Sequence, residues 1–554
     1  MSPLRPTADL ATHEVVNQPV PLEDYNLFDT DTVLKQAVAR EAGAGADDVA
    51  RRLSAYGAEL GRADMLAAAG DANRFAPELR THDRYGHRID EVAFHPAYHR
   101  LMELGIAHRQ PSIAWGPGPD ASHVAHAGLE FLMHQVEAGV CCPMSMTYAV
   151  VPALRHNSDI AAVWEPKLLS DRYDPSFQPV DGKTGATMGM AMTEKQGGSD
   201  VRANTTRATP LTGDEYELVG HKWFCSAPMS DAFLTLAYTD AGLTCFFVPR
   251  WRPDGTRNAL FIQRLKDKVG NRSNASSEIE YHRTWARRVG EDGRGVATII
   301  EMVHHTRLDC TVGAASLMRA ALAQAIHHCT HRRAFQKTLI DQPLMQSVLA
   351  DLALESEAAT ALALRVARAF DASDADEGQR AFARLAVAVA KYWLNKRTPG
   401  FVYEALECHG GAGYVEEAPI ARLYREAPLN SIWEGSGNVI CLDVLRTLDK
   451  EPAAAEALMG ELEAARGADA RLDAAIDRLT GVLADKAGAV TNARLIVEQA
   501  ALVLQGALLV AHAPAEVADG FVASRLADGG GHAYGTLPAG LDVAAIVERA
   551  RPRL

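Results

Sequence analysis

A change in the spacing of apolar residues divides this chain into parts that cannot share one type of secondary structure. From about residue 46 to 175, and again from 295 onward, apolar residues recur every three or four positions, which is the period of an amphipathic helix. In between they alternate with polar residues, as in Glu215–Val219, Phe233–Tyr238 and Thr244–Val248. The pattern predicts an α+β chain in which helices flank a small antiparallel sheet.

The length of 554 residues exceeds what one hydrophobic core supports, so we predict four domains. They are an N-terminal extension and helical domain over 1–185, a β domain over 186–290, a helical bundle over 291–448 and an extra helical domain over 449–554. The bundle is predicted from the continuous apolar faces of Val296–His331, Pro343–Phe370 and Gly378–Glu407. Residues 1–40 show little periodicity and are expected to form the extension.

Charge and apolar content exclude several classes of function. The net charge of −14 gives no general attraction to nucleic acid or to an anionic membrane, so such binding would need a local basic patch. The segment Met1–Asp31 lacks the apolar core of a signal peptide. The longest apolar stretch, Ala500–Ala511, is interrupted by Gln505 and Gly506 and looks too short to span a bilayer. We therefore expect a cytoplasmic protein without a membrane partner.

Cysteines and histidines give no sign of a metal site. None of the eight cysteines forms a C-x-x-C pair, and no Cys/His cluster has the spacing of a zinc site. His304, His305, His327 and His328 lie on a helical pattern without a matched set of partners, which is typical of structural or surface histidines. Metal ligands are therefore predicted to be absent, and reduced, buried cysteines are expected.

Two segments of the predicted sheet region supply groups that a flavin ring needs. Met190–Asp200 contains Thr193 and the Gly197-Gly198-Ser199 turn, which offer hydroxyls and backbone amides. About thirty residues later, Gly220–Ser226 offers the ring of Phe224 and the hydroxyl of Ser226 in strand alternation. The alternative is that Trp223 and Phe224 only pack a sheet core, and the residues by themselves leave both interpretations open.

A single carboxylate near position 434 is the candidate base. Glu434 lies in Ile432–Asn438, between apolar neighbours and glycines that allow a sharp turn before a helix. Trp433 and Ile432 would partly desolvate it and raise its pKa, as a base requires, while Ser436 or Asn438 could cap the helix that follows. The alternative is an acidic residue that only complements the helix dipole.

Two glycine- and arginine-containing segments suit a phosphate-bearing ligand. His331–Phe335 places arginines at the predicted end of a helix, and Gly410–Tyr414 is a glycine turn that permits close backbone approach. The glycine clusters do not form a strand–GxGxxG–helix unit, so a Rossmann nucleotide site is not supported.

Taken in their order along the chain, these motifs resemble the acyl-CoA dehydrogenase family. Thr193–Asp200, Lys266–Ala275, Leu423–Ala427 and Trp433–Asn438 are further similar to its alkylation-response, AidB-like branch. The resemblance covers nearly the whole chain and is weakest after about residue 450.

The resemblance implies an acyl-CoA dehydrogenase-like fold with FAD between the β domain and the bundle, in a homotetramer whose neighbouring subunit completes the cofactor site. It implies that Glu434 removes the α-proton of an acyl thioester. The alternative base position of isovaleryl-type members falls at Thr306, which cannot serve, and the adjacent Arg307 is placed at the substrate. The residues implied to contact FAD are Met190, Met192, Thr193, Gly198, Ser199, Phe224, Cys225, Ser226, Arg332, Phe335, Gly410, Gly411, Ser436 and Asn438.

Departures from the common family pattern are typical of the AidB-like branch. Glu407 stands where many members have glutamine, and Lys195-Gln196 replaces Pro-Gly. That branch is associated with weak dehydrogenase activity and with double-stranded DNA binding in the response to alkylating agents, and Arg446 matches its DNA-related arginine.

Two hypotheses follow from the resemblance. The first is an FAD-containing flavoprotein of the alkylation response with weak dehydrogenase activity and double-stranded DNA as a candidate partner. The second is an ordinary short- or branched-chain acyl-CoA dehydrogenase without DNA binding. The tail after 448 carries more acidic than basic residues, and phosphate contacts normally supply most DNA affinity. The basic groups Arg283/Arg287/Arg288 and Arg549/Arg551/Arg553 are interpreted as solvated surface.

Overall fold

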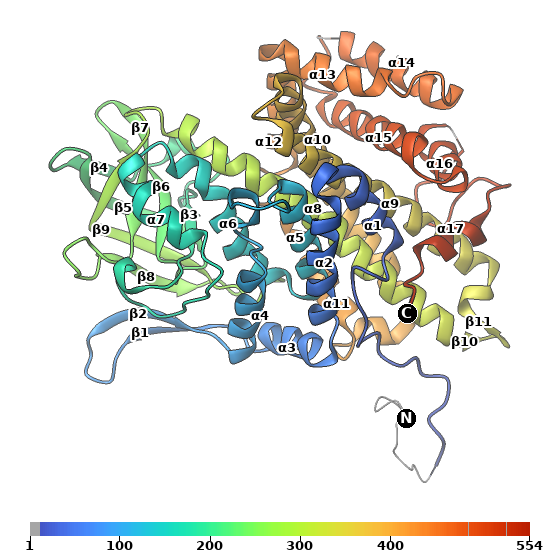
Figure 1. Ribbon diagram of the computed structural model, residues 1–554, viewed down its shortest axis with the longest axis horizontal. Coiled ribbons are helices and arrows are strands. Elements are labelled where there is room, and N and C mark those ends of the chain that lie inside the picture. The colour runs from blue at the N-terminus through green and yellow to red at the C-terminus, as the bar shows by residue number, and fades with distance from the viewer. Residues whose placement is uncertain (1–11, 486, 528) are drawn as a thin grey trace. The chain divides into compact units, whose positions relative to one another are not determined.

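The computed structural model describes residues 12–485, 487–527 and 529–554, and the start of the predicted N-terminal extension, 1–11, lies outside them (Figure 1). The chain divides into two compact units, Met1–Ala63 with Cys310–Leu554 and Asp64–Asp309. The long helix α8 (Gly295–His331) contributes residues to both units. This division is coarser than the four predicted domains, whose boundaries stay a prediction.

The 64–309 unit contains a seven-stranded sheet. Its strands are β3 (Met188–Ala191), β4 (Arg207–Pro210), β5 (Glu215–Ser226), β6 (Ala232–Thr239), β7 (Gly242–Pro249), β8 (Leu260–Leu265) and β9 (Ser276–Val289). The order is β3-β6-β4-β5-β9-β7, with β8 on β9, and β7 also pairs with β6, so the sheet curls back on itself. Most pairs are antiparallel as predicted, but β3 and β4 each pair in parallel with β6.

The core of this sheet explains the alternating pattern. Phe233, Phe246 and Tyr281 are buried inside it with Leu218 and Ile262. Strands β6 and β7 are buried along almost their whole length, so their polar positions need partners inside the protein. The sheet residues predicted to bind the flavin lie on β5, on β3 and on the loop after β3.

Helices α4 (Pro96–Ala107), α5 (His123–Val136), α6 (Ala138–Leu154) and α7 (Ser158–Leu168) belong to the same unit. Nearly every residue of α5 and α6 is buried, and Glu137 separates the two helices. Its carboxylate accepts hydrogen bonds from the Val140 amide at 3.0 Å and from the Ser273 hydroxyl at 2.7 Å, which satisfies the start of α6.

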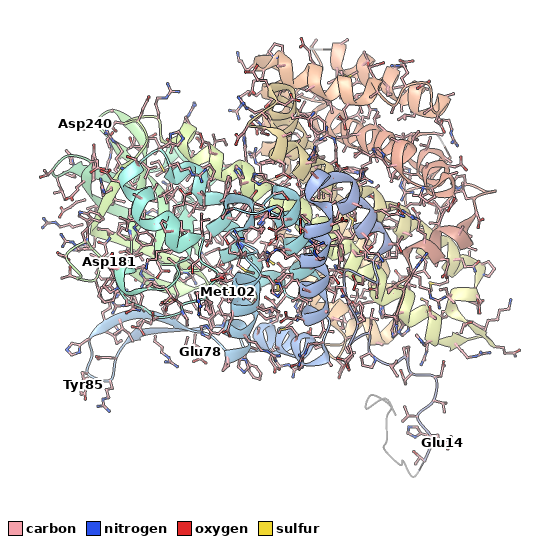
Figure 2. All side chains as sticks on the ribbon, in the orientation of Figure 1. Glu14, Glu78, Tyr85, Met102, Asp181 and Asp240 are labelled. Carbon is pink, nitrogen blue, oxygen red and sulfur yellow. The ribbon has the colours of Figure 1, made fainter. Side chains whose placement is uncertain are left out.

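A β-hairpin precedes these helices and was not predicted. Strands β1 (Glu78–His82) and β2 (Arg88–Ala93) are antiparallel, and Figure 2 shows Tyr85 at the tip of the hairpin. Asp83 forms the turn by accepting hydrogen bonds from the amides of Tyr85 and His87 at 2.8 and 2.9 Å. The strands carry charged residues on both faces, so they lack the apolar alternation that would have revealed them.

The other unit is helical. Its elements within the described residues are α1 (Thr32–Glu41), α2 (Ala46–Leu60), α9 (Pro343–Ala372), α10 (Glu377–Glu407), α11 (Pro419–Glu426), α12 (Gly437–Lys450), α13 (Pro452–Glu463), α14 (Ala470–Ala484), α15 (Ala493–His512), α16 (Ala515–Phe521) and α17 (Val543–Ala550), with a short hairpin of β10 (Arg333–Ala334) and β11 (Lys337–Thr338). The three predicted bundle helices agree with α8, α9 and α10 to within two residues. Helix α1 lies inside the segment expected to be irregular; Asp31 caps it by accepting from the Leu34 amide at 3.0 Å.

The helices after residue 448 pack on α9 and α10 through polar contacts as well as apolar ones. Arg365 on α9 donates two hydrogen bonds to Glu461 on α13, at 2.6 and 2.8 Å. Trp393 on α10 donates from its indole to Gln505 on α15 at 3.1 Å.

Helix α15 is long and apolar enough to cross a membrane by length and composition, which overturns the expectation that this stretch is too short. However, 61% of its apolar window is buried inside the protein. Its bonded Gln505 is fully buried as well. Packing in the core therefore explains its composition.

Candidate active site

The loop after β3 presents the first predicted flavin-binding residues. Glu194 and Gly197 form a bridge that closes a tight turn, with Gly197 at a φ of +147°. A Cβ added at Gly198 would lie 2.4 Å from Thr193 Oγ1, so only glycine allows the hydroxyl to sit against this turn. Met190 and Met192 are half-buried and Ser199 is exposed. Thr193, Gly197 and Gly198 are half-buried, so the contact of this loop with a flavin stays a prediction.

A buried ion pair fixes this loop, and the sequence analysis did not identify it. Lys222 on β5 lies 2.9 Å from Glu194 Oε1, and it also donates to the Leu236 carbonyl at 2.8 Å. Glu194 further accepts hydrogen bonds from the Thr205 amide at 2.7 Å and from the Thr206 hydroxyl at 2.6 Å. Burial opposes the charge of Glu194, but Lys222 and these hydrogen bonds outweigh it and lower the pKa of Glu194 to about 2.

The end of β5 carries the second predicted group. The Phe224 side chain is 47% exposed, and the Ser226 hydroxyl lies 3.2 Å from that of Ser276. The ammonium of Lys266 lies 4.7 Å from the centre of the Phe224 ring. The structure thus rejects the alternative in which Phe224 only fills the sheet core.

The side chain of Cys225, which the resemblance implied to contact FAD, faces the sheet core, so a contact of its backbone with FAD stays a prediction. The thiol is fully buried in the sheet core, and burial raises its pKa to about 12, so it stays neutral. Its carbonyl accepts a hydrogen bond from the Ser277 hydroxyl at 2.9 Å. Strand alternation explains this: Phe224 faces outward, so its neighbour must face the core.

Arg307, the predicted substrate residue, lies on α8 and is 5% exposed. The hydroxyl of the adjacent Thr306 donates to the Val303 carbonyl at 3.1 Å, one turn earlier in the same helix. The Thr306 hydroxyl therefore makes a hydrogen bond within its own helix. A substrate contact of Arg307 stays a prediction.

In the helical unit, Glu434 lies on the bend that leads into α12. Its backbone has a φ of +58°, a left-handed conformation that is uncommon for a residue with a side chain and costs on the order of 1–3 kcal/mol. Gly435 follows with a φ of +100°. Ile432 is 63% exposed, so it does not provide the desolvation that the sequence analysis expected. Strained backbone of this kind is concentrated at functional sites.

Ser436 and Asn438 begin α12. Ser436 occupies the N-cap position, but its side chain makes no capping hydrogen bond within the described chain. Asn438 accepts a hydrogen bond from Arg494 of α15 at 2.8 Å, which links the extra helices to this bend. A Cβ at Gly437 would lie 2.8 Å from Lys396 Cε, so α10 and the start of α12 approach closely.

Phe335 projects from the turn of the β10–β11 hairpin and is 93% exposed. The preceding Arg332 donates to the Asn17 carbonyl at 2.6 Å, and the Asn17 side chain bonds the backbone of Arg333 on both its N–H and C=O sides. The described N-terminal segment therefore holds the hairpin in place while its aromatic tip remains uncovered in the single chain.

The glycine turn at 410–411 is open. Gly410 has a φ of +59°, and a Cβ added at either Gly410 or Gly411 would meet no atom within 4 Å. Both residues are exposed. Their backbone is thus accessible to a ligand at close range, which is the role predicted for this turn.

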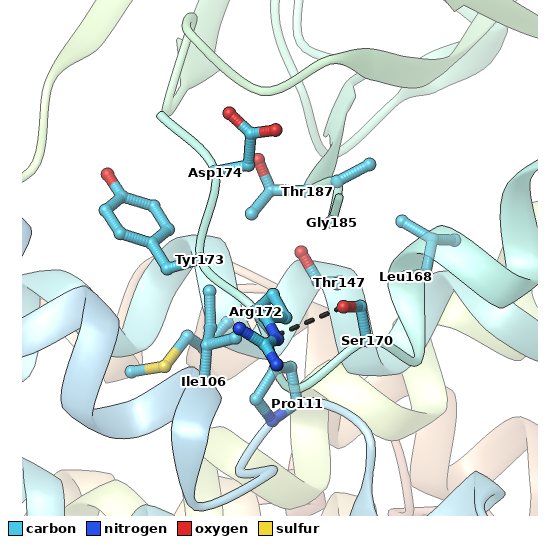
Figure 3. Close-up of a pocket in the computed structure, with 12 residues that line it drawn as sticks. Ile106, Pro111, Thr147, Leu168, Ser170, Arg172, Tyr173, Asp174, Gly185 and Thr187 are labelled. Atoms are coloured by element: carbon cyan, nitrogen blue, oxygen red, sulfur yellow. Dashed lines mark hydrogen bonds between the residues drawn. The ribbon is translucent and has the colours of Figure 1, made fainter. Parts of the chain in front are cut away.

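Figure 3 shows a separate hollow in the 64–309 unit, lined by residues that include Thr147, Arg172, Tyr173 and Thr187. The Ser170 hydroxyl at its wall accepts from the Arg172 amide at 3.1 Å. The lining contains none of the residues predicted to bind FAD, substrate or DNA. The hollow therefore does not correspond to any of the predicted binding sites.

One buried group within the described ranges has ligand-type atoms close together: those of Glu130, His134 and Cys141 lie within 4.8 Å of one another. Spacing rules missed it because its members come from two helices. Gln110 donates to Glu130 and lies 3.8 Å from the Cys141 sulfur. Burial and nearby Glu130 raise the pKa of Cys141 well above its usual value. The predicted absence of a metal stays a prediction.

Comparison with known proteins identifies the family. Residues 17–175 match the Adaptive response protein AidB N-terminal domain, 189–284 the acyl-CoA dehydrogenase middle domain and 293–448 the acyl-CoA dehydrogenase C-terminal domain. The AidB protein of Escherichia coli (strain K12) is 47% identical over 84% of this chain and 86% of its own length. The chain belongs to the acyl-CoA dehydrogenase family. Its N-terminal domain is of the AidB type, which confirms the predicted branch.

Further relatives support the fold. Acyl-CoA dehydrogenase family member 11 of Caenorhabditis elegans is 31% identical over 72% of this chain and 66% of its own length. The crystal structure of Caenorhabditis elegans ACDH-11 in complex with C11-CoA matches 98% of this chain and 94% of that one, with a TM-score of 0.83 and 26% identity. An FAD complex of a Bacillus anthracis acyl-CoA dehydrogenase shares the fold at a TM-score of 0.60 and 19% identity, covering 77% and 79% of the two chains. The predicted acyl-CoA dehydrogenase fold is confirmed.

Proposed function

We propose that this family member is an FAD-dependent acyl-CoA dehydrogenase whose base is Glu434. The observation that carries the proposal is the backbone of Glu434, held in a left-handed conformation on a glycine bend before α12 in a chain of this family. A carboxylate on such a fixed bend can remove the acidic α-proton of a thioester. Arg307 on α8 is the residue proposed to contact the substrate.

The accessible groups on the chain suit FAD. The Thr193–Gly198 turn, the exposed Phe224 face and the open backbone at Gly410 and Gly411 supply hydroxyls, an aromatic surface and room for close approach. When bound, FAD supplies the acceptor for the hydride that leaves the β-carbon. The chain itself orients the thioester, excludes water and takes the α-proton on the Glu434 carboxylate.

The test is anaerobic addition of a panel of acyl-CoAs, from short and branched chains to chains of about the length in the ACDH-11 complex. The flavin absorbance is expected to bleach with at least one member of the panel, and Glu434→Gln is expected to abolish bleaching. Glu456→Gln, an exposed acid on α13, is the matched control and should bleach like the wild type. A flavin that no acyl-CoA bleaches contradicts the proposal.

A homotetramer is proposed in which a neighbouring subunit approaches the Arg332–Phe335 hairpin and the Gly410–Gly411 turn. What supports it is the 93% exposure of Phe335, whose ring the described chain leaves uncovered beside the predicted cofactor-contacting Arg332. Sedimentation velocity at micromolar concentration should show a tetramer, and a monomeric species would contradict the assembly. A cytoplasmic location is proposed as well, to be checked by cell fractionation.

A role in the alkylation response, with double-stranded DNA as partner and weak dehydrogenase activity, is the second candidate. It is favoured by the AidB-type N-terminal domain. Local charge argues against strong binding, since Arg446 lies 2.6 Å from Asp443, which also pairs with Arg384. A gel shift of duplex DNA that weakens with salt and with Arg446→Gln would support the role. If duplex DNA is not shifted even at low salt, DNA binding is contradicted and a metabolic acyl-CoA dehydrogenase without DNA binding remains.

A further inference from the structure

Lys391 is a buried lysine in the middle of α10, and its side chain is directed at the bend that carries Glu434. The residue is 1% exposed. Its ammonium donates a hydrogen bond to the Trp433 carbonyl at 2.7 Å and another to the Gly435 carbonyl. One cation therefore binds the backbone on both sides of the proposed base.

These contacts explain how a strained backbone persists at Glu434. A left-handed residue followed by a glycine at φ +100° has many other conformations available to it, so the surroundings must select this one. Two charge-assisted hydrogen bonds to flanking carbonyls fix the orientation of the peptide groups before and after Glu434. A carbonyl that turned away would cost the buried ammonium one of these two hydrogen bonds.

Helix α10 is itself a rigid support for this contact. Asn395, one turn after Lys391, donates to the Lys391 carbonyl at 2.8 Å and to the Cys310 carbonyl of α8 at 3.1 Å. Further along, Lys396 packs against Gly437, where a Cβ would lie 2.8 Å from its Cε. The same helix therefore contacts both the bend at Glu434 and the first residue of α12.

We propose that Lys391 is a positioning residue for the base: its ammonium holds the peptide groups on either side of Glu434 so that the carboxylate is presented in one orientation. This inference rests on the proposed function of Glu434. A misplacement of about 1 Å at a reacting group can reduce a rate by about 100-fold. Lys391 thus acts on proton abstraction through the backbone without touching the substrate.

The experiment measures exchange of the α-protons of 3,3-dimethylbutanoyl-CoA with deuterated water, on holoenzyme. This thioester has α-hydrogens but no β-hydrogen, so the measurement isolates the base from hydride transfer. Lys391→Met keeps the length of the side chain and removes the charge and the donors. We expect it to retain bound FAD, to keep the affinity for the thioester and to exchange about 100-fold more slowly per flavin.

Lys450→Met is the matched control, because Lys450 is an exposed lysine at the end of α12. It should exchange at the wild-type rate. If Lys391→Met is recovered without FAD, Lys391→Arg replaces it. A guanidinium keeps the charge but spreads its donors over a planar fork, so an intermediate rate per flavin is expected.

The outcomes separate the two levels of the proposal. A wild-type protein that exchanges, together with a Lys391 variant that exchanges equally fast per flavin, overturns the positioning role alone. Loss of exchange in proportion to loss of FAD assigns Lys391 a merely structural role and also overturns it. If the wild-type protein exchanges the α-protons of neither this probe nor any acyl-CoA that bleaches the flavin, the proposed role of Glu434 as the base is wrong. The inference about Lys391 then fails with it.

Discussion

The ammonium of Lys222 on β5 lies 2.9 Å from Oε1 of Glu194, and neither side chain has exposed surface. The pair connects a central strand to the loop that presents Thr193 and Gly198. The connection is reinforced by the Trp223 amide, which donates to the Thr193 carbonyl at 2.8 Å. The predicted flavin-binding loop is thus fixed by two charges that are both buried in the protein.

Removal of one partner of this pair should destabilise the protein strongly. Lys222→Met leaves the carboxylate of Glu194 buried without its counter-charge, and loss of one partner of a buried ion pair typically costs about 3–5 kcal/mol of unfolding free energy. Chemical unfolding followed by circular dichroism measures the change, and the FAD content of the purified variant should fall with it.

Arg283→Met is the control for this variant. Arg283 pairs with Glu217 at 3.0 Å on the surface of the same sheet, with 72% of its side chain exposed. Such exposed pairs contribute about 0–1 kcal/mol. Equal losses of stability in the two variants would show that burial of the Lys222 pair has no special effect.

The same pair predicts a dependence of stability on acid pH. The pKa of Glu194 is lowered from 4.5 to about 2 in the folded protein, so the unfolded chain takes up the proton first as pH falls. The stabilisation is fully present above about pH 4.5 and is lost as pH falls towards 2. Urea unfolding at pH 6, 4 and 3 should show the difference between wild type and Glu194→Gln narrowing with acidity. A constant difference would contradict the lowered pKa.

Periodicity predicted the large elements well because it depends only on neighbouring residues. The run Gly378–Glu407 became α10 with the same C-terminal residue, and Thr244–Val248 lies inside β7. The glycine-flanked setting of Glu434 led to the prediction that it is the base, which stays a prediction, and the structure adds its left-handed backbone. One prediction from the local pattern was wrong: Ile432 was expected to shield Glu434 from water, but it is exposed.

What the sequence could not show are partners that are distant along the chain. Lys391 reads as a polar interruption of an apolar helix, and nothing near it indicates that it binds carbonyls at 433 and 435. Lys222 likewise reads as the polar face of a strand, although its partner Glu194 lies 28 positions earlier. One signal was available: a lysine at a position where the apolar pattern requires burial must have a buried partner.

The exposed aromatic tip at Phe335 gives a test of assembly. Phe335→Ala should change the unfolding free energy of the single chain by less than about 0.5 kcal/mol, because the ring is 93% exposed. If a neighbouring subunit covers the ring, the variant should dissociate at higher protein concentration than the wild type and release FAD more readily. Sedimentation velocity across a dilution series measures the assembled and the dissociated protein. Val490→Ala, at another exposed apolar side chain, is the control, and identical dissociation of the two variants would contradict a role for Phe335.

A second pH effect is expected at the end of α8, next to Arg332. Burial, together with the nearby His409, Arg332, His327 and His331, lowers the pKa of His328 from 6.5 to about 4. The unfolded chain therefore binds the proton before the folded chain does, and stability should fall as pH drops from about 6.5 towards 4. His328→Gln should remove part of this loss, whereas His82→Gln, at an exposed histidine of the β1–β2 hairpin, should not. Thermal unfolding between pH 7.5 and 4.5 measures the stability of the wild type, His328→Gln and His82→Gln. Parallel curves for wild type and His328→Gln would show that another group is responsible for the loss, because the imidazole would then titrate alike in the folded and unfolded chains.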